Sequence, residues 1–325
     1  MVRAQSARGI SGALAVIQAE RLKRSFGSVP AVNGLSFEVG EGEVFGFLGP
    51  NGAGKTTTIR LLACLILPTD GSAKVCGFSV TSDPTKVRER VGILTENPSL
   101  YERLTAQENM EFFAKAYGVP AANIEPRIAE LFEFFDLHDR GSEVVGRFSR
   151  GMKQKLSIAR ALVHSPPVLL LDEPTANLDP ESSKEVRTMI SQLTKREKCV
   201  VVLSTHRLDD AEKLCNRVMV IHKGRSIAID SPEALRKKMA GPQVLEVHLR
   251  EENAPAVEAV RRLPSVKAFQ RDYKKLLLTL DDPEVSTPDI VATIVAAGGQ
   301  ILSVYVQVQS LEDAYLKLIG EEKTT

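Results

Sequence analysis

Short apolar runs alternate with longer segments of helical periodicity over the first two thirds of the chain. Three of these runs, Val44–Leu48, Val168–Leu171 and Val200–Leu203, are compact and lead into polar or glycine-containing loops. Runs of this kind are typical of strands buried in a mostly parallel sheet. The pattern therefore predicts an α/β domain, which we place at residues 16–241.

The middle of that region, residues 97–164, has a different pattern. Few of its apolar residues are β-branched, and the large ones fall at helical spacings: Phe112, Phe113, Tyr117, Leu131, Phe132 and Phe135. Because this spacing keeps apolar side chains on one face of a helix, it predicts a helical subdomain inserted into the α/β domain.

A third pattern begins near residue 231. Ser231-Pro232 is typical of a helix start, and Gly241-Pro242 is typical of a helix end. The apolar positions that follow predict strand, helix, strand, strand, helix and strand, which is the ferredoxin-like plan, and then a last helix over Leu311–Leu318. We therefore expect a small α+β domain with an accessory or regulatory role at residues 242–325.

Composition and charge exclude several classes of protein. With 42 Lys and Arg against 41 Asp and Glu, the net charge of +1 argues against bulk electrostatic binding to nucleic acid. The longest apolar run, Leu61–Leu67, is far shorter than the ~20 residues of a membrane-spanning helix. Ser11 and Gly12 interrupt a weakly apolar stretch, so residues 1–15 are expected to be a flexible tail rather than a signal peptide. The four cysteines show no CxxC spacing, which fits a reducing cytosol.

A glycine-rich loop directly follows the first apolar run. The segment GPNGAGKT, from Gly49 to Thr56, satisfies GxxxxGK[ST] and precedes a helical pattern. Its glycines let backbone N–H groups converge on phosphates, Lys55 places a charge on the β- and γ-phosphates, and the Thr56 hydroxyl can ligate Mg²⁺. The sequence therefore predicts a nucleotide-phosphate site formed by Gly49, Pro50, Asn51, Gly52, Ala53, Gly54, Lys55, Thr56 and Thr57.

A pair of carboxylates ends the second apolar run. Asp172 and Glu173 follow Val168–Leu171 directly. Nucleotide hydrolases hold Mg²⁺ and orient water with carboxylates at such a strand end. We therefore expect Asp172 to bind the ion, through water, and Glu173 to act as the general base on the attacking water.

The segment FSRGMKQKLSIARAL, from Phe148 to Leu162, narrows the class of nucleotide hydrolase. It resembles the signature segment of ATP-binding cassette (ABC) ATPases, and it stands just before the carboxylate strand, as it does in that family. Further elements of the family occur in order: Phe26 in LKRSFG, Asp179 in ANLDP and His206 in LSTH. The chain is therefore identified by resemblance as a P-loop ATPase of this family, with ATP and Mg²⁺ as expected ligands.

The resemblance implies a role for each matched residue. Phe26 would stack on adenine, and His206 would hydrogen-bond the γ-phosphate and help hold the attacking water. Ser149 and the N–H of Gly151 would contact ATP held by another subunit, and Asp179 would lie in the D-loop. Two copies, or this chain and a paralogue, would therefore sandwich two ATP molecules head to tail.

The matched segments also depart from the family's pattern. In the signature, Phe148, Arg150 and Met152 replace the usual Leu, Gly and Gln, while Ser149 and Gly151 remain. At the Q-loop position, in VGILTENPSLY, the family's Gln is Glu96. Because an ionised Glu only accepts hydrogen bonds, we expect Glu96 to favour Mg²⁺ and to disfavour a nearby γ-phosphate.

The family mostly powers membrane transport, so the resemblance implies a separate multi-spanning membrane permease. Leu100, Tyr101 and Leu104 would line the groove for a coupling helix of that permease; alternatively, they pack inward. The C-terminal segment SVYVQVQSLEDAYLKLIG resembles the ATPase subunits of drug, antibiotic or ion export systems. We therefore expect an exporter ATPase in the cytoplasm, on the inner face of the cell membrane. The alternatives are an importer cassette and a soluble ABC machine of DNA repair or translation, although no surface for nucleic acid is expected.

Overall fold

The computed structural model describes residues 15–96, 100–197, 199–239 and 243–307. These residues form two compact units that divide between Pro232 and Glu233. The sequence pattern places the end of the α/β domain at residue 241, and this domain boundary remains a prediction.

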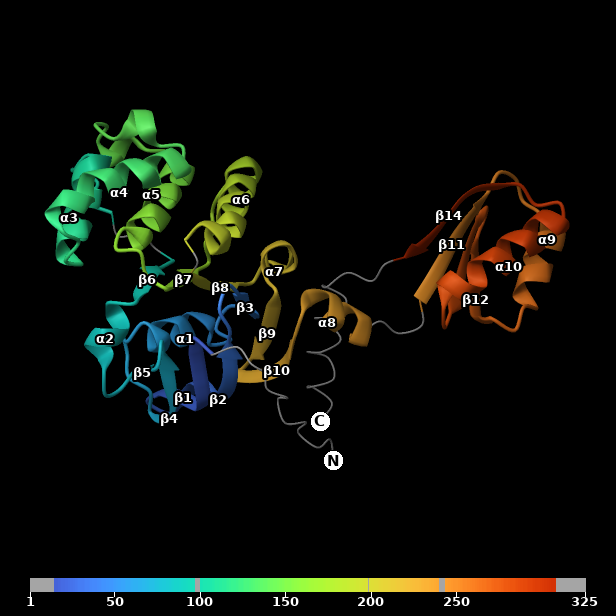
Figure 1. The fold of residues 1–325 in the computed structure, drawn as a ribbon. Coiled ribbons are helices and arrows are strands. Elements are labelled where there is room, and N and C mark those ends of the chain that lie inside the picture. The colour runs from blue at the N-terminus through green and yellow to red at the C-terminus, as the bar shows by residue number, and fades with distance from the viewer. Residues whose placement is uncertain (1–14, 97–99, 198, 240–242, 308–325) are drawn as a thin grey trace. The chain divides into compact units, whose positions relative to one another are not determined.

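A six-stranded sheet carries the chemistry-bearing loops of the first unit, in the order β10-β9-β3-β8-β7-β6 (Figure 1). The five strands from β9 to β6 run parallel, whereas β10 is antiparallel to β9. The predicted parallel sheet is thus present. The bounds are β3 (Val44–Leu48), β6 (Val91–Leu94), β7 (Val168–Asp172), β8 (Val200–Thr205), β9 (Arg217–His222) and β10 (Arg225–Asp230).

A second, antiparallel sheet in this unit was not predicted. Its strands are β1 (Ile17–Phe26), β2 (Val29–Val39), β4 (Asp70–Val75) and β5 (Phe78–Ser79), in the order β2-β1-β4-β5. Register shifts interrupt the pairing of β1 with β2, and Arg21 has a φ of 45°. These irregularities break the two-residue alternation by which a strand is found in a sequence.

The core of the first unit joins the two sheets. Phe37 of β2 stacks on Phe45 of β3 with ring centroids 5.7 Å apart, and its ring meets Phe47 edge-on at 5.3 Å. Helix α1 (Lys55–Leu62) contributes Ile59 and Leu62 to the same buried cluster. Because α1 contacts strands of both sheets, its first turn is fixed at the carboxyl end of β3. The other helices of this core are α2 (Pro84–Arg88), α6 (Pro180–Arg196) and α7 (Leu208–Leu214).

Helices occupy the region where helical periodicity predicts them (Figure 1). Thr105 caps α3 in a capping box, in which its hydroxyl accepts from the backbone N–H of Glu108 and the Glu108 carboxylate accepts from Thr105. A buried ion pair between Arg127 and Glu197, 2.6 Å long, ties this helical region to the residue after α6. The helices are α3 (Ala106–Ala116), α4 (Ala121–Phe134) and α5 (Arg150–Leu162), with 3₁₀ turns at His138–Arg140 and Val145–Arg147.

The second unit has one antiparallel sheet, in the order β12-β13-β11-β14. Alternate residues of β11, Leu245 and Val247, are buried against Val260 and Ile290 of two helices. The predicted succession of strands and helices is present up to residue 307, whereas Leu311–Leu318 and Gly241-Pro242 lie outside the described residues. The bounds are α8 (Pro232–Met239), β11 (Gln243–Leu249), α9 (Ala254–Arg261), β12 (Val266–Asp272), β13 (Lys275–Leu280), α10 (Pro283–Ala296) and β14 (Ile301–Gln307).

Candidate functional site

The glycine-rich loop joins β3 to α1, as the sequence predicts, and two of its glycines are required by close backbone approach. A Cβ at Gly54, where φ is 108°, would lie 2.3 Å from the carbonyl oxygen of Ala31. A Cβ at Gly49 would lie 2.3 Å from the carbonyl oxygen of Ile221. No side chain fits at these distances. The loop is therefore held tightly, with its backbone N–H groups at the start of α1, where anions are favoured.

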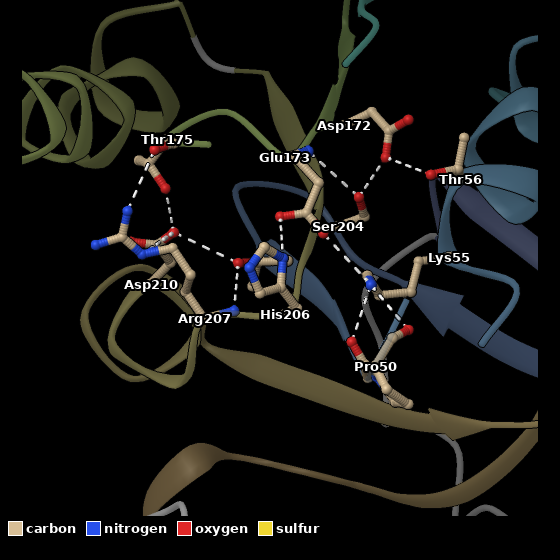
Figure 2. A network of polar contacts seen from close by, with 12 residues as sticks. Pro50, Lys55, Thr56, Asp172, Glu173, Thr175, Ser204, His206, Arg207 and Asp210 are labelled. Carbon is tan, nitrogen blue, oxygen red and sulfur yellow. Dashed lines mark hydrogen bonds and ion pairs between the residues drawn. The ribbon is translucent and has the colours of Figure 1, made fainter. Parts of the chain in front are cut away.

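The Lys55 side chain links this loop to the end of β7 (Figure 2). Its ammonium donates to the carbonyl oxygens of Gly49 at 2.9 Å and Pro50 at 3.2 Å. It also lies 3.3 Å from Glu173 Oε1, and both side chains of this ion pair are buried. The structure thus brings together two motifs that are 118 positions apart (173 − 55).

Three oxygen-bearing side chains meet at the end of β7 (Figure 2). The hydroxyls of Thr56 and Ser204 both donate to Asp172 Oδ1, that of Thr56 at 3.0 Å. Sequence reasoning missed Ser204. Its place in the segment LSTH is the sequence signal that could have identified it. Strand β8 pairs with β7 so that Ser204 lies opposite Asp172.

Glu173 is held in an uncommon backbone conformation, with a φ of 51°. Its N–H donates to the backbone oxygen of Ser204 at 3.1 Å, which anchors it to the neighbouring strand. Its Oε2 lies 3.0 Å from His206 Nδ1, and the His206 ring is about half exposed (Figure 2). A carboxylate and an imidazole are thus in contact beside the Lys55 ammonium, which suits the movement of a proton.

A pocket of about 620 Å³ contains most of the predicted nucleotide site. Phe26 borders it with a half-exposed ring, and the guanidinium of Arg24 lies 4.7 Å from that ring's centroid. Gly49, Pro50 and Asp172 were predicted but do not line the pocket, whereas Ala31, Ala176 and Asn177 line it without having been predicted. The lining comprises Phe26, Ala31, Asn51, Gly52, Ala53, Gly54, Lys55, Thr56, Thr57, Glu96, Glu173, Ala176, Asn177 and His206.

Glu96 lies in this lining as an exposed residue directly before a gap in the described chain. Its carboxylate therefore shares the pocket with Lys55 and Thr56. Asn177 was missed although it stands in ANLDP; its φ of 60° is one that Asn tolerates better than most residues.

Three further predicted residues do not line the pocket: Ser149, Gly151 and Asp179. Ser149 caps α5 by accepting from the Met152 N–H, and Asp179 caps α6 by accepting from the Ser182 N–H and hydroxyl at 2.9 and 2.7 Å. The backbone and side-chain hydrogen bonds from Ser182 lower the pKa of Asp179. A Cβ at Gly151 would lie 2.7 Å from the Ser182 hydroxyl oxygen. The two helix starts are therefore in contact with each other.

The residues predicted to line a coupling-helix groove differ in their exposure. Tyr101 is 47% exposed and packs edge-on against Phe112, which is equally exposed, with centroids 5.1 Å apart. Leu100 and Leu104 are half-buried. In the described part of the chain, we find no helix long and apolar enough to span a membrane.

Comparison with known proteins identifies the family of the chain. A family model described as "ABC transporter" matches residues 32–176. The linearmycin resistance ATP-binding protein LnrL of Bacillus subtilis (strain 168) is 33% identical over 94% of this chain and 98% of its own length. The Nod factor export ATP-binding protein I of Paraburkholderia xenovorans (strain LB400) is 40% identical over 75% of this chain and 82% of its own length. A solved structure of the ATP-binding subunit of an ABC transporter is 31% identical, covers 69% of this chain and 92% of its own chain, and superposes with a TM-score of 0.62.

These relatives are export and resistance proteins, which favours transport over a soluble machine and export over import. The similarity to LnrL extends over 94% of the chain rather than over the phosphate loop alone. The chain therefore belongs to the ATP-binding cassette family, as the ATP-binding subunit of an ABC exporter and an ATPase whose hydrolysis of ATP drives transport.

Proposed function

We propose that the pocket around Lys55 binds the triphosphate of ATP and that Glu173 and His206 act on the attacking water. The observation that carries the proposal is that the Glu173 carboxylate contacts both the Lys55 ammonium, at 3.3 Å, and the His206 imidazole, at 3.0 Å. Glu173 accepts the proton of the water, and His206 hydrogen-bonds the γ-phosphate. Phe26 offers its exposed ring face to adenine.

The oxygen donors at the end of β7 fit Mg²⁺. The Thr56 hydroxyl and the Asp172 carboxylate are 3.0 Å apart, and hydroxyl and carboxylate oxygens are ligands that this ion prefers. Glu96 supplies a further carboxylate in the same pocket. We assign these three residues to the ion, whose bound charge would neutralise that of the phosphates.

A second copy, or a paralogue, completes the site. Ser149, Gly151 and Asp179 lie together at two helix starts but outside the pocket of their own chain. A helix N-terminus favours an anion, so these residues suit the γ-phosphate of ATP bound by a partner. In a head-to-tail dimer with two Mg-ATP, the helix starts of each copy would face the ATP in the pocket of the other copy.

A multi-spanning permease is the proposed membrane partner. A second pocket, of about 470 Å³, lies between α2, β6 and the end of α3, and its apolar residues include Leu65, Val91, Ile93 and Tyr117. A short amphipathic helix would bury apolar side chains there, next to the Arg88 guanidinium. We therefore also propose that the chain lies in the cytoplasm, against the inner face of the membrane. The permease, rather than this chain, then selects the exported compound.

We further propose that the second unit is a ferredoxin-like regulatory domain or dimer brace. The β-α-β-β-α-β succession and the antiparallel order β12-β13-β11-β14 support this proposal. The proposed domain begins after residue 241.

The variant Glu173→Gln tests the base directly. The amide cannot accept a proton from water, so steady-state ATP hydrolysis is expected to fall by roughly a hundredfold or more while ATP binding is kept. Glu125→Gln makes the same chemical change on an exposed part of α4 and serves as the control. Near-normal turnover by Glu173→Gln would remove Glu173 from the proposed role.

Copurification with Glu173→Gln and Mg-ATP tests the membrane partner. The tagged full chain is isolated from native membranes in mild detergent, because stalled hydrolysis preserves the ATP-bound complex. A multi-spanning protein that copurifies with it supports the permease. Recovery with DNA, with ribosomes or alone contradicts the permease.

A further inference from the structure

A buried carboxylate outside the pocket has no role in the chemistry described so far. Asp210 lies on α7, four residues after His206, and its side chain is completely buried (Figure 2). It does not line the nucleotide pocket. A buried charge is costly unless it is paired and hydrogen-bonded, so its partners show which elements it holds.

The partners of Asp210 come from three separate elements. The hydroxyl of Thr175, two residues after Glu173, donates to Oδ2. The hydroxyl of Thr205, which ends β8 directly before His206, lies 3.4 Å from the same oxygen. The guanidinium of Arg187 on α6 donates to Oδ1 at 3.0 Å. One carboxylate therefore contacts the loop after the proposed base, the strand end before the histidine, and the helix that Asp179 caps.

Arg207 closes this network on the side of the histidine (Figure 2). Its side chain donates to the carbonyl oxygen of Thr175 at 3.2 Å, and its backbone N–H donates to the Thr205 hydroxyl oxygen at 2.9 Å. Its Nε lies 4.0 Å from Asp210 Oδ2. The residues on both sides of His206 are thus joined to the loop that carries Glu173.

The geometry between Glu173 and His206 depends on such a support. The His206 ring is about half exposed, so packing alone does not fix it, and Glu173 has a left-handed backbone conformation. Their side chains nevertheless lie 3.0 Å apart. Buried networks whose members are all satisfied hold the groups attached to them rigidly.

We propose that Asp210 is a positioning residue for ATP hydrolysis, which sets the Glu173–His206 contact by tying Thr175 and Thr205 to one buried carboxylate. This inference rests on the proposed roles of Glu173 and His206. It implies that Asp210 influences the rate of the chemical step and leaves the affinity for ATP unchanged, because none of its contacts faces the nucleotide pocket.

The variant Asp210→Asn tests the proposal in the full chain. The amide keeps the shape but removes the charge and one acceptor. The kcat is expected to fall roughly tenfold to a hundredfold, since a catalytic group misplaced by about 1 Å costs about a hundredfold. The KM for ATP and the Kd for a non-hydrolysable ATP analogue are expected to stay within about twofold. Asp209→Asn is the matched control, because Asp209 is the exposed neighbour on the same helix and pairs with Lys213.

A second pair of variants keeps the test decisive if Asp210→Asn folds poorly. Thr175→Val removes the hydroxyl at nearly constant volume, and Thr175→Ser retains it. Valine is expected to lower kcat as Asp210→Asn does, and serine to recover most of that loss. The double variant with Asp210→Asn is expected to be no slower than the slower single variant, because both changes break the same contact.

The outcomes separate this inference from the proposed function. Full kcat in folded Asp210→Asn or Thr175→Val, beside an inactive Glu173→Gln, overturns the positioning role and leaves the base in place. A loss of thermal stability with an unchanged kcat per bound nucleotide also overturns it, because that is the signature of a purely structural carboxylate. Near-normal turnover by Glu173→Gln contradicts the proposed function itself.

Discussion

At the residue scale, the chemistry-bearing side chains were predictable and the residues that hold them were not. Lys55, Glu173 and His206 stand in motifs whose residue types follow from phosphate and water chemistry. Ser204 lies opposite Asp172 only because β8 pairs with β7, and Asp210 reaches Thr175 and Thr205 from α7, so these contacts depend on strand register and helix placement. Short-range patterns in a sequence contain neither.

His164 allows a prediction at this scale that concerns stability. Its ring stacks on that of Tyr117, with centroids 3.9 Å apart. Burial, and to a smaller extent the Arg127 guanidinium, lower the pKa of His164 from its ordinary 6.5 to about 4. The unfolded chain therefore binds a proton at a higher pH than the folded protein does. The contribution of His164 to the free energy of unfolding is complete above pH 6.5. It declines as the pH falls toward 4, so that the free energy of unfolding is lower by roughly 2 kcal/mol at pH 5.

Denaturant unfolding of His164→Gln at pH 7.5 and pH 5 checks this pH dependence. The variant is expected to lose roughly 2 kcal/mol less than the natural chain between the two values, since glutamine takes up no proton. His138→Gln, at an exposed position, is the control. An equal loss in the natural chain and in His164→Gln would contradict the prediction.

At the element scale, the elements that could be predicted are those with one unbroken periodicity. Strand β7 has all five residues buried, so its sequence is a continuous apolar run, and α4 buries Ile124, Ile128, Leu131 and Phe132, which share one helix face. Strand β1 is amphipathic but carries bulges, so its alternation is lost. The antiparallel sheet that covers the core was missed for this reason, although the parallel sheet was found.

The ion pair between the helical region and the core gives a prediction at the element scale. Arg127 of α4 contacts the buried Glu197 at 2.6 Å and the half-exposed Glu130 at 2.9 Å. Removing one partner of a buried pair leaves a charge without compensation, whereas an exposed pair contributes little. Glu197→Gln is expected to lower the free energy of unfolding by about 3 kcal/mol, and Glu130→Gln by about 0.5 kcal/mol or less. Equal effects in denaturant unfolding would mean that the buried pair does not join the two parts.

At the scale of the whole molecule, the change of apolar pattern near residue 231 predicted a second unit, because each unit buries its own set of apolar residues. The first unit encloses Phe45 and Ile59 among others, and the second encloses Leu245 and Ile290. The described residues divide at Pro232, close to the Ser231-Pro232 helix start. The sequence could not show how the second unit serves the ATPase, because a fold of this kind does not specify a function.

The separate cores of the two units lead to a prediction for a chain that lacks residues 242–325. The fragment 1–241 retains every residue assigned to the nucleotide pocket and the whole buried cluster of the first unit. We therefore expect it to fold and to bind ATP with a Kd within about threefold of the full chain. Its dimerisation or the regulation of its turnover is expected to change. Light scattering of the Glu173→Gln fragment with Mg-ATP would measure the dimerisation, and hydrolysis assays of the active fragment would measure the turnover. A fragment that folds but cannot bind ATP would place part of the nucleotide site beyond residue 241. Unchanged assembly and turnover would instead contradict the role of the second unit as a brace or regulator. Contact with the membrane partner would then be its remaining role.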